Sequence, residues 1–143
     1  MHQVFKDNIS RDNIEEFLQE ILEYSIAYKR ITTSNLNDTD ADKILKRLNS
    51  LDMSVLYPFL MSFIIYAQNN KLPQSELLKV ISIVETYIFR RSFCGVPTNA
   101  LNKVFTTLHK EVLRRLDDDY LYSDVVVFVL QNKSGSGRFP VNE

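Results

Sequence analysis

Hydrophobic side chains recur every three or four residues along most of the chain, which is the spacing of one face of an α-helix. The clearest stripe predicts a helix from about Gln74 to Phe93, and Gly95 is expected to end it. A second stripe from Leu101 to Leu116 predicts the following helix, with Thr98 as its N-cap. The members of the first stripe are Leu77, Val80, Ile81, Val84 and Ile88.

Three further helices are predicted in the first half of the chain. The first begins near Ser10, the second is capped by Asp38 or Thr39, and the third is capped by Ser54. Pro58 falls in the first turn of the third helix, where proline is tolerated, and a kink at that point is the alternative. One face of the first helix consists of Ile14, Phe17, Leu18, Ile21, Ser25 and Tyr28.

The run from Val125 to Val129 is the one segment whose residues favour a β-strand. No second strand is available to pair with it, so we predict a short sixth helix capped by Ser123 and Asp124. The sequence therefore predicts an all-α fold of about six helices in an irregular antiparallel bundle. Consecutive helices are expected to be antiparallel neighbours at the tight turns 69–74 and 94–98. The apolar faces of the six helices are expected to cover one another.

The composition fits one globular domain, with 143 residues of which 45% are hydrophobic and 24% are charged. We assign residues 1–133 to this domain and interpret residues 134–143, which contain a Ser-Gly tract, as a linker. The longest uncharged apolar run, Val55 to Ala67, is shorter than a membrane span. With a single cysteine and no signal peptide, the chain is expected to be cytoplasmic and not membrane-bound.

Charge is distributed unevenly, and residues 71–116 carry eight basic and three acidic side chains. Lys103, Lys110 and Arg114 are separated by seven and four residues, which places them on one side of the predicted helix, opposite its apolar stripe. Such a row could contact DNA phosphates, or it could simply be the solvated side of an amphipathic helix.

The pair Arg90 and Arg91 is more unusual. By helical spacing, Arg91 continues an apolar stripe, where a guanidinium needs hydrogen-bonding partners or the carbonyl groups of a helix end. Two roles remain open for Arg91: a structural one, and contact with another domain or with nucleic acid. Arg90 points elsewhere and is expected to be exposed.

Residues suited to catalysis are scarce. The two histidines, His2 and His109, lie far apart in the sequence, and neither is accompanied by a cluster of metal ligands. His109 is interpreted as a rim or solvent histidine, and Cys94 as a packed structural thiol. We assign no catalytic, cofactor-binding or metal-ligating residue and expect no cofactor.

The segment from Glu85 to Phe105, hereafter the signature segment, resembles a motif in the helical region of GmrSD-type modification-dependent restriction endonucleases. The family pattern is E-x-Y-hydrophobic-x-R-R-x-hydrophobic-C-G-x-x-T-x-x-L-N-K-x-F. Residues 40–143 as a whole are similar to that region, including Arg138-Phe139-Pro140 near the end. The matching positions are Glu85, Tyr87, Arg90, Arg91, Cys94, Gly95, Thr98, Leu101, Asn102, Lys103 and Phe105.

These bacterial proteins have a ParB-like domain before the helical region and often an HNH nuclease domain after it. The Asp-Gly-Gln-Gln-Arg motif of the first domain and the HNH histidines of the second do not occur in this sequence. The resemblance therefore implies a non-catalytic scaffold or linker domain that positions catalytic domains of the same polypeptide in phage or plasmid defence. Residues 134–143 would then lead toward a further C-terminal domain.

Two alternatives remain open beside the scaffold. The first is a DNA-binding module that uses the candidate contact residues, and the second is a protein-interaction adaptor with an exposed apolar patch. The oligomeric state is not predicted. The candidate contact residues are Arg90, Arg91, Lys103, Lys110 and Arg114.

Overall fold

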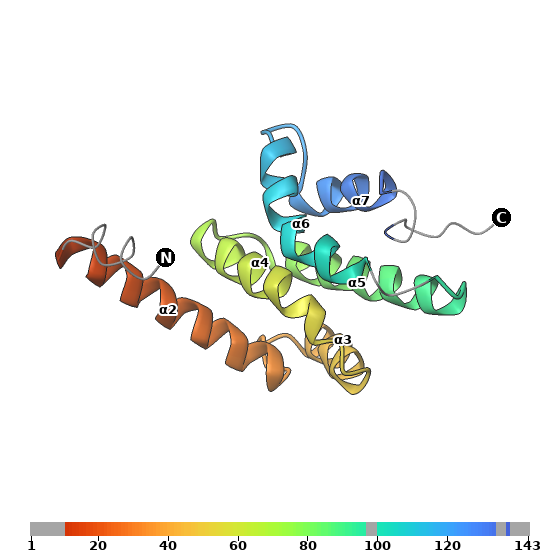
Figure 1. Ribbon diagram of the computed structural model, residues 1–143, viewed down its shortest axis with the longest axis horizontal. Coiled ribbons are helices and arrows are strands. Elements are labelled where there is room, and N and C mark those ends of the chain that lie inside the picture. Colours follow the sequence, from red (N-terminus) through yellow and green to blue (C-terminus); the bar gives the residue numbers. More distant parts are fainter. Residues whose placement is uncertain (1–10, 97–99, 134–136, 138–143) are drawn as a thin grey trace.

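A computed structural model describes residues 11–96, 100–133 and 137, and Figure 1 shows their arrangement. The described residues form six α-helices and one short 3₁₀ helix, η1, and they contain no β-strand. The all-α prediction is therefore confirmed, including the helical state of Val125 to Val129. The elements are α2 (Arg11–Thr32), α3 (Thr39–Ser50), η1 (Ser54–Leu56), α4 (Tyr57–Asn69), α5 (Gln74–Phe93), α6 (Leu101–Arg115) and α7 (Tyr122–Gln131).

The helices are arranged in two rows, because the closest approaches mostly join helices that are two apart in the sequence. In one row α4 lies between α2 and α6, and in the other α5 lies between α3 and α7. Helices α6 and α7 also lie close together and join the rows. This differs from the expectation that the helices joined at 69–74 and 94–98 are antiparallel neighbours, since α5 lies in the other row from α4 and α6.

The helices of both rows share one hydrophobic core. Phe59 and Phe63 of α4 stack with ring centroids 6.0 Å apart, and Phe105 of α6 packs against Phe59 at 6.2 Å. Leu108 and Val112 of α6 are also fully buried. Most of the uncharged run from Val55 to Ala67 lies in α4, which occupies the middle of its row.

Several helix ends follow the sequence signals. Asp38 is the N-cap of α3, and its carboxylate accepts a hydrogen bond of 2.9 Å from the backbone N–H of Ala41. The expected cap at Ser54 is wrong: this residue starts η1, and α4 follows directly from that turn. Pro58 lies in the first turn of α4, where its missing N–H leaves no helical hydrogen bond unmade.

Helix α7 is capped from another part of the chain. Its N-cap residue, Leu121, offers no side-chain hydrogen bond, so the predicted capping by Ser123 and Asp124 is wrong. Instead, the buried carboxylate of Glu76 on α5 accepts hydrogen bonds from the backbone N–H of Ser123 at 3.1 Å and from its hydroxyl at 3.0 Å. A negative charge is favourable at this end of a helix.

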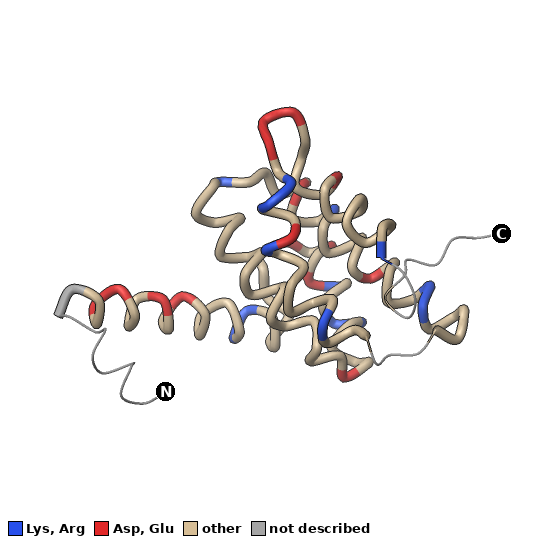
Figure 2. The backbone as a smooth tube through the Cα atoms, turned by 45° about the horizontal axis from the view of Figure 1, so that its top comes forward, with Lys and Arg blue, Asp and Glu red and all other residues tan. Residues whose placement is uncertain are grey.

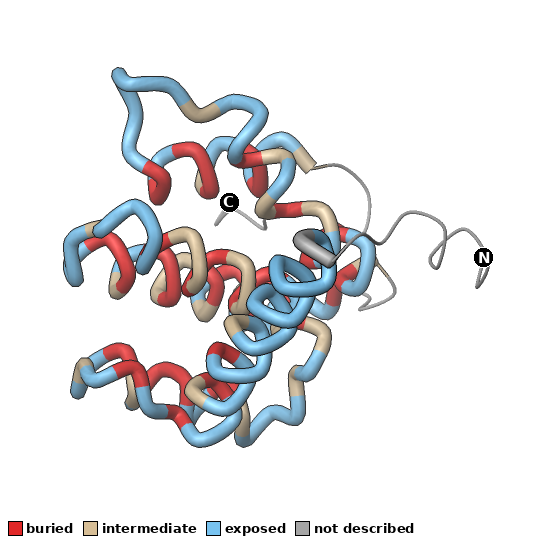
Figure 3. Tube along the Cα trace, turned by 90° about the vertical axis from the view of Figure 1, so that its left-hand side faces the viewer, coloured by how far each residue is buried: buried red, intermediate tan, exposed pale blue. Residues whose placement is uncertain are grey.

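The apolar face predicted for the first helix does not enter the core. Only the last turns of α2 contribute to the core, through the buried residues Ala27 and Ile31. Ile14, Leu18 and Tyr28 of the predicted face are exposed. In Figure 3 the tube of α2 is coloured almost entirely as exposed. The expectation that all apolar faces cover one another is therefore wrong for α2, because its first half extends beyond the neighbouring helices.

Three expectations fall on residues outside the described part of the chain. These are the helix start at Ser10, the cap at Thr98, and the linker over residues 134–143 apart from Gly137. None of the described helices combines the length and apolarity that crossing a membrane would require.

Candidate domain and nucleic-acid interface

The signature segment forms the end of α5, the turn after it and the start of α6. Gly95 adopts a left-handed backbone with φ of 68°, a conformation that side chains with a Cβ atom disfavour. The N–H of Val96 donates to the carbonyl of Arg91 at 2.9 Å, and the N–H of Gly95 donates to that of Ser92 at 3.2 Å. This pair of bonds is a Schellman motif, which confirms Gly95 as the predicted helix stop.

Arg91 lies inside the molecule with an exposed fraction of 2%. Its guanidinium carbon is 5.2 Å from the ring centroid of Tyr87, and Nη1 donates to the Tyr87 hydroxyl at 3.4 Å. That hydroxyl in turn donates to the backbone carbonyl of Gly137 at 2.6 Å. Burial raises the pKa of Tyr87, and the nearby Arg91 charge partly opposes this rise. Tyr87 therefore joins α5 to the chain at Gly137, and the buried Arg91 guanidinium lies against the Tyr87 ring.

The other charged members of the signature segment lie nearer the surface. Glu85 accepts two hydrogen bonds from the guanidinium of Arg47, at 2.8 and 2.9 Å, and this ion pair joins α3 to α5. Arg90 is half-buried, so the expectation that it is exposed is wrong, whereas its neighbour Arg91, which continues the apolar stripe, is fully enclosed.

The predicted row of cations on α6 lies on the surface. Lys103, Lys110 and Arg114 are all exposed, on the side of the helix opposite the buried stripe of Leu101, Val104, Phe105, Leu108 and Val112. None of the three takes part in an ion pair within the described part of the chain. By contrast, Glu111 at the edge of this surface is paired with Lys133 at 2.8 Å. We call Lys103, Lys110 and Arg114 the α6 basic face.

Two aromatic residues of the signature segment, which the sequence analysis did not single out, also face solvent. Phe93 is 95% exposed and Phe89 is 44% exposed, at the end of α5. They could have been recognised because both fall off the apolar stripe of that helix. Phe89 borders a pocket of about 520 Å³ between the end of α5 and the start of α6. The pocket is lined by Leu51, Met53, Ile88, Phe89, Arg91, Ser92, Gly95, Val96 and Leu101.

Cys94 differs from its predicted setting, whereas His109 lies at the rim, which is one of the two settings predicted for it. Cys94 is exposed, so the packed thiol is wrong; the residue caps α5 at a position beyond its buried stripe. His109 is half-buried, and its Nδ1 shares a hydrogen bond of 2.7 Å with the Tyr122 hydroxyl. Its ring also packs edge-on against Tyr66. Burial lowers the pKa of His109 and raises that of Tyr122, so both groups are neutral near pH 7.

Within the residues described, no three His, Cys, Asp or Glu side chains converge as a metal site would require. A scan of protein-family models and searches of curated proteins and of solved structures find no match to this chain.

Proposed function

We propose that this chain is a non-catalytic helical scaffold domain of a GmrSD-like restriction protein. In that role it positions neighbouring domains of the same polypeptide, and its α6 basic face contacts DNA. The proposal rests on one observation: the signature segment has a buried part and an exposed part. Its buried members fix the corner between α5 and α6, while Phe89, Phe93 and Lys103 present a surface there.

The exposed aromatic residues support contact with another domain. A phenylalanine that is 95% exposed leaves nearly all of its apolar surface in water, which is unfavourable unless a partner covers it. The end of α5 that carries Phe93 closes in the Schellman motif, and Tyr87 on the same helix is bonded to Gly137. A fixed surface with apolar groups around a pocket is suited to holding a neighbouring domain in one orientation.

The α6 basic face supports contact with the DNA backbone. Three cations on one side of a straight helix can neutralise phosphates without reading the base sequence. Within the described residues, no carboxylate forms an ion pair with any of these three cations. We therefore expect weak binding that is independent of sequence and sensitive to salt.

Fluorescence anisotropy with a labelled DNA duplex tests this contact. The logarithm of the binding constant should fall with the logarithm of salt concentration with a slope near −2.7, which corresponds to roughly three phosphate contacts. The double variant K103Q/K110Q should weaken binding at low salt and reduce the slope by about two contacts.

The matched control is K43Q/K46Q, which removes two exposed lysines from α3. This control should bind DNA almost as well as the unchanged protein. Equal losses in the two double variants would mean that binding follows total charge, and a flat titration at low salt would remove DNA contact from the proposal.

The scaffold role is tested by the gene itself. Sequencing outward from this segment should reveal, in the same reading frame, a ParB-like domain before it or an HNH nuclease domain after it. A reading frame that encodes only a free-standing helical protein would contradict the proposal. The purified chain should neither cleave DNA nor hydrolyse nucleotides, and metal-dependent cleavage by clean protein would also contradict it.

A helical adaptor without enzymatic activity is the second candidate. The observation that favours it is the large exposed apolar surface on α2, since surfaces of that kind mark sites where proteins bind one another. An adaptor would be encoded alone, so the sequencing experiment separates it from the scaffold.

A further inference from the structure

The exposed side of α2 has the pattern of a helix that packs against another helix, and the described residues leave much of it uncovered. Six large apolar side chains on this side are between 44% and 58% exposed. We call them the α2 apolar face: Ile14, Leu18, Ile21, Leu22, Ile26 and Tyr28.

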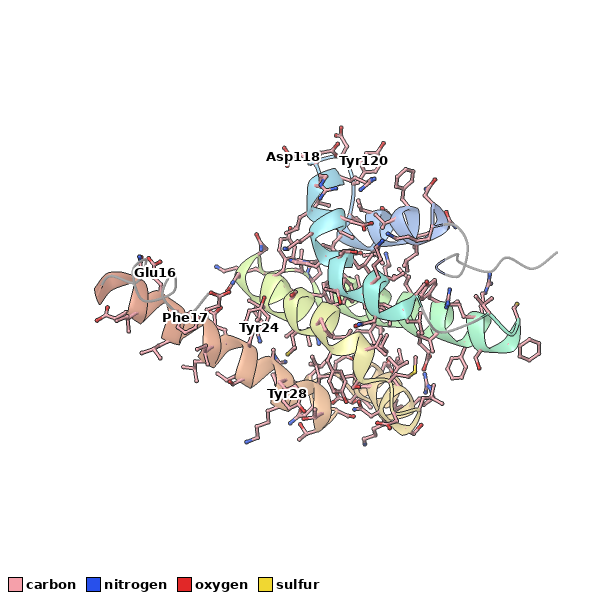
Figure 4. All side chains as sticks on the ribbon, viewed as in Figure 1. Glu16, Phe17, Tyr24, Tyr28, Asp118 and Tyr120 are labelled. Atoms are coloured by element: carbon pink, nitrogen blue, oxygen red, sulfur yellow. The ribbon has the colours of Figure 1, made fainter. Side chains whose placement is uncertain are left out.

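The attachment of α2 to the rest of the molecule leaves this face open. Tyr24 shares a hydrogen bond of 3.4 Å with Ser62 of α4, and the ring of Tyr28 meets that of Tyr57 edge-on at 5.8 Å. Figure 4 shows Tyr24 and Tyr28 beside α4, with Phe17 farther along α2. An open groove of about 480 Å³ runs along the contact and is lined by Phe17, Glu20, Ile21, Tyr24, Ser25, Tyr28 and Met61.

The exposed area is large enough to support association. With about 200 Å² for each fully exposed large side chain, the six exposed fractions amount to roughly 600 Å². This equals the upper end of the largest apolar patch on an ordinary monomer, about 300–600 Å². It also approaches the area of about 800 Å² that each partner contributes to a stable interface.

The charges along α2 indicate what the partner is. One line along α2 passes through Glu15, Leu22 and Lys29, because these residues are seven apart. The acid lies at one end of this line and the base at the other. Neither Glu15 nor Lys29 forms an ion pair with a described residue. A second α2 running in the opposite direction would place its Lys29 beside Glu15 and its Glu15 beside Lys29. A parallel copy would place like charges together.

We propose that two copies of this chain associate through the α2 apolar face, with their α2 helices antiparallel. The first half of α2 extends beyond the other helices, so the two bundles lie at opposite ends of the helix pair (Figure 2). Apolar residues at helical spacing then interdigitate along the seam, and Glu15 and Lys29 fix the direction of pairing. The pairing goes beyond the proposed scaffold role and does not use the α6 basic face.

Sedimentation equilibrium of the full chain tests the association. The mass should rise with protein concentration from 16.7 kDa to twice that value. The variant L18E introduces a charge into the seam, at the most exposed apolar position of the face, and should remain monomeric at every concentration. The control F128E changes an equally exposed apolar residue on α7 and should dimerise like the unchanged protein.

Circular dichroism of all three proteins at low concentration should give the same helical spectrum and melting temperature, because both positions are exposed. A protein that stays monomeric at all concentrations overturns the proposal, and an external partner of the face would then be the remaining explanation. A dimer that L18E leaves intact, or that F128E also dissociates, overturns it as well.

A charge exchange tests the direction of pairing. E15K and K29E should each raise the dimer Kd roughly three- to tenfold, because each creates two repulsive pairs across an antiparallel interface. The double variant E15K/K29E restores both attractive pairs and should return the Kd to its original value. Single variants that dimerise as tightly as the unchanged protein, or a double variant that shows no rescue, would overturn the antiparallel arrangement and with it the proposal.

Discussion

Tyr87 illustrates how one side chain can join distant parts of this chain. Its ring is buried against Phe105 and the Arg91 guanidinium, and its hydroxyl reaches the carbonyl of Gly137. A spacing argument places Tyr87 and Arg91 next to each other on α5, since four residues make about one turn. It cannot provide Gly137, which is fifty residues away in the sequence.

Removing the Tyr87 hydroxyl should destabilise the fold. In Y87F the Gly137 carbonyl loses its buried donor, so we expect the free energy of unfolding to fall by about 1–2 kcal/mol. Urea denaturation followed by circular dichroism measures this change. The control Y120F, at an exposed tyrosine, should leave the unfolding midpoint unchanged, and an equal effect of the two substitutions would contradict the assigned role.

His109 makes stability depend on pH. Burial lowers its pKa in the folded state, so in mildly acidic solution the unfolded chain binds a proton more readily than the folded protein does. The stability that depends on neutral His109 is therefore fully present above the unfolded pKa of about 6.5. It is lost as the pH falls through the lower pKa of the folded state.

The measurement is the free energy of unfolding between pH 7.5 and pH 5. It should decline in the unchanged protein and decline less steeply in H109Q, which cannot titrate in this range. H2Q removes the other histidine and should retain the full decline. A decline that is unaffected by H109Q would show that other groups are responsible.

At the scale of helices, local signals in the sequence were reliable where the stabilising group lies nearby. Asp38 and Gly95 act within three residues of their own helix ends, and both were predicted. The cap of α7 was not predicted, because its acceptor, Glu76, is 47 residues from Ser123. The cations behaved similarly: helical spacing alone places the α6 basic face and puts Arg91, not Arg90, on the apolar stripe, while the half-buried position of Arg90 depends on the three-dimensional structure.

Glu76 should contribute more to stability than its place near the start of α5 suggests. In E76A the buried N–H and hydroxyl of Ser123 both lose their charged acceptor, so unfolding should require about 2–3 kcal/mol less. The matched control is D124A, which removes an exposed acid from the first turn of α7 itself and should change stability by less than about 0.5 kcal/mol. Thermal melts of both variants decide between the local and the distant cap.

At the scale of the whole molecule, the number and type of helices could be predicted but their arrangement could not. Periodicity identifies which residues of a helix are apolar, and it does not show which neighbour covers them. The stripe of α5 is buried as expected, whereas most of the equally regular stripe on α2 faces solvent because α4 covers only part of it. The exposed Phe89 could not be interpreted as part of a surface until the structure placed it at the border of a pocket between the end of α5 and the start of α6.

The arrangement in two rows also has a consequence for how the molecule opens. A stack in which each member touches mainly the next comes apart from its outermost member inward, and α2 is the outermost member of its row, held chiefly by α4. In the isolated monomer, amide hydrogens of α2 should therefore exchange with solvent before those of α4 and α5. This exchange would occur by local unfolding of α2 while the remaining helices stay folded. Exchange measured by NMR or mass spectrometry would reveal this order, and uniform exchange across all helices would indicate a single cooperative unit.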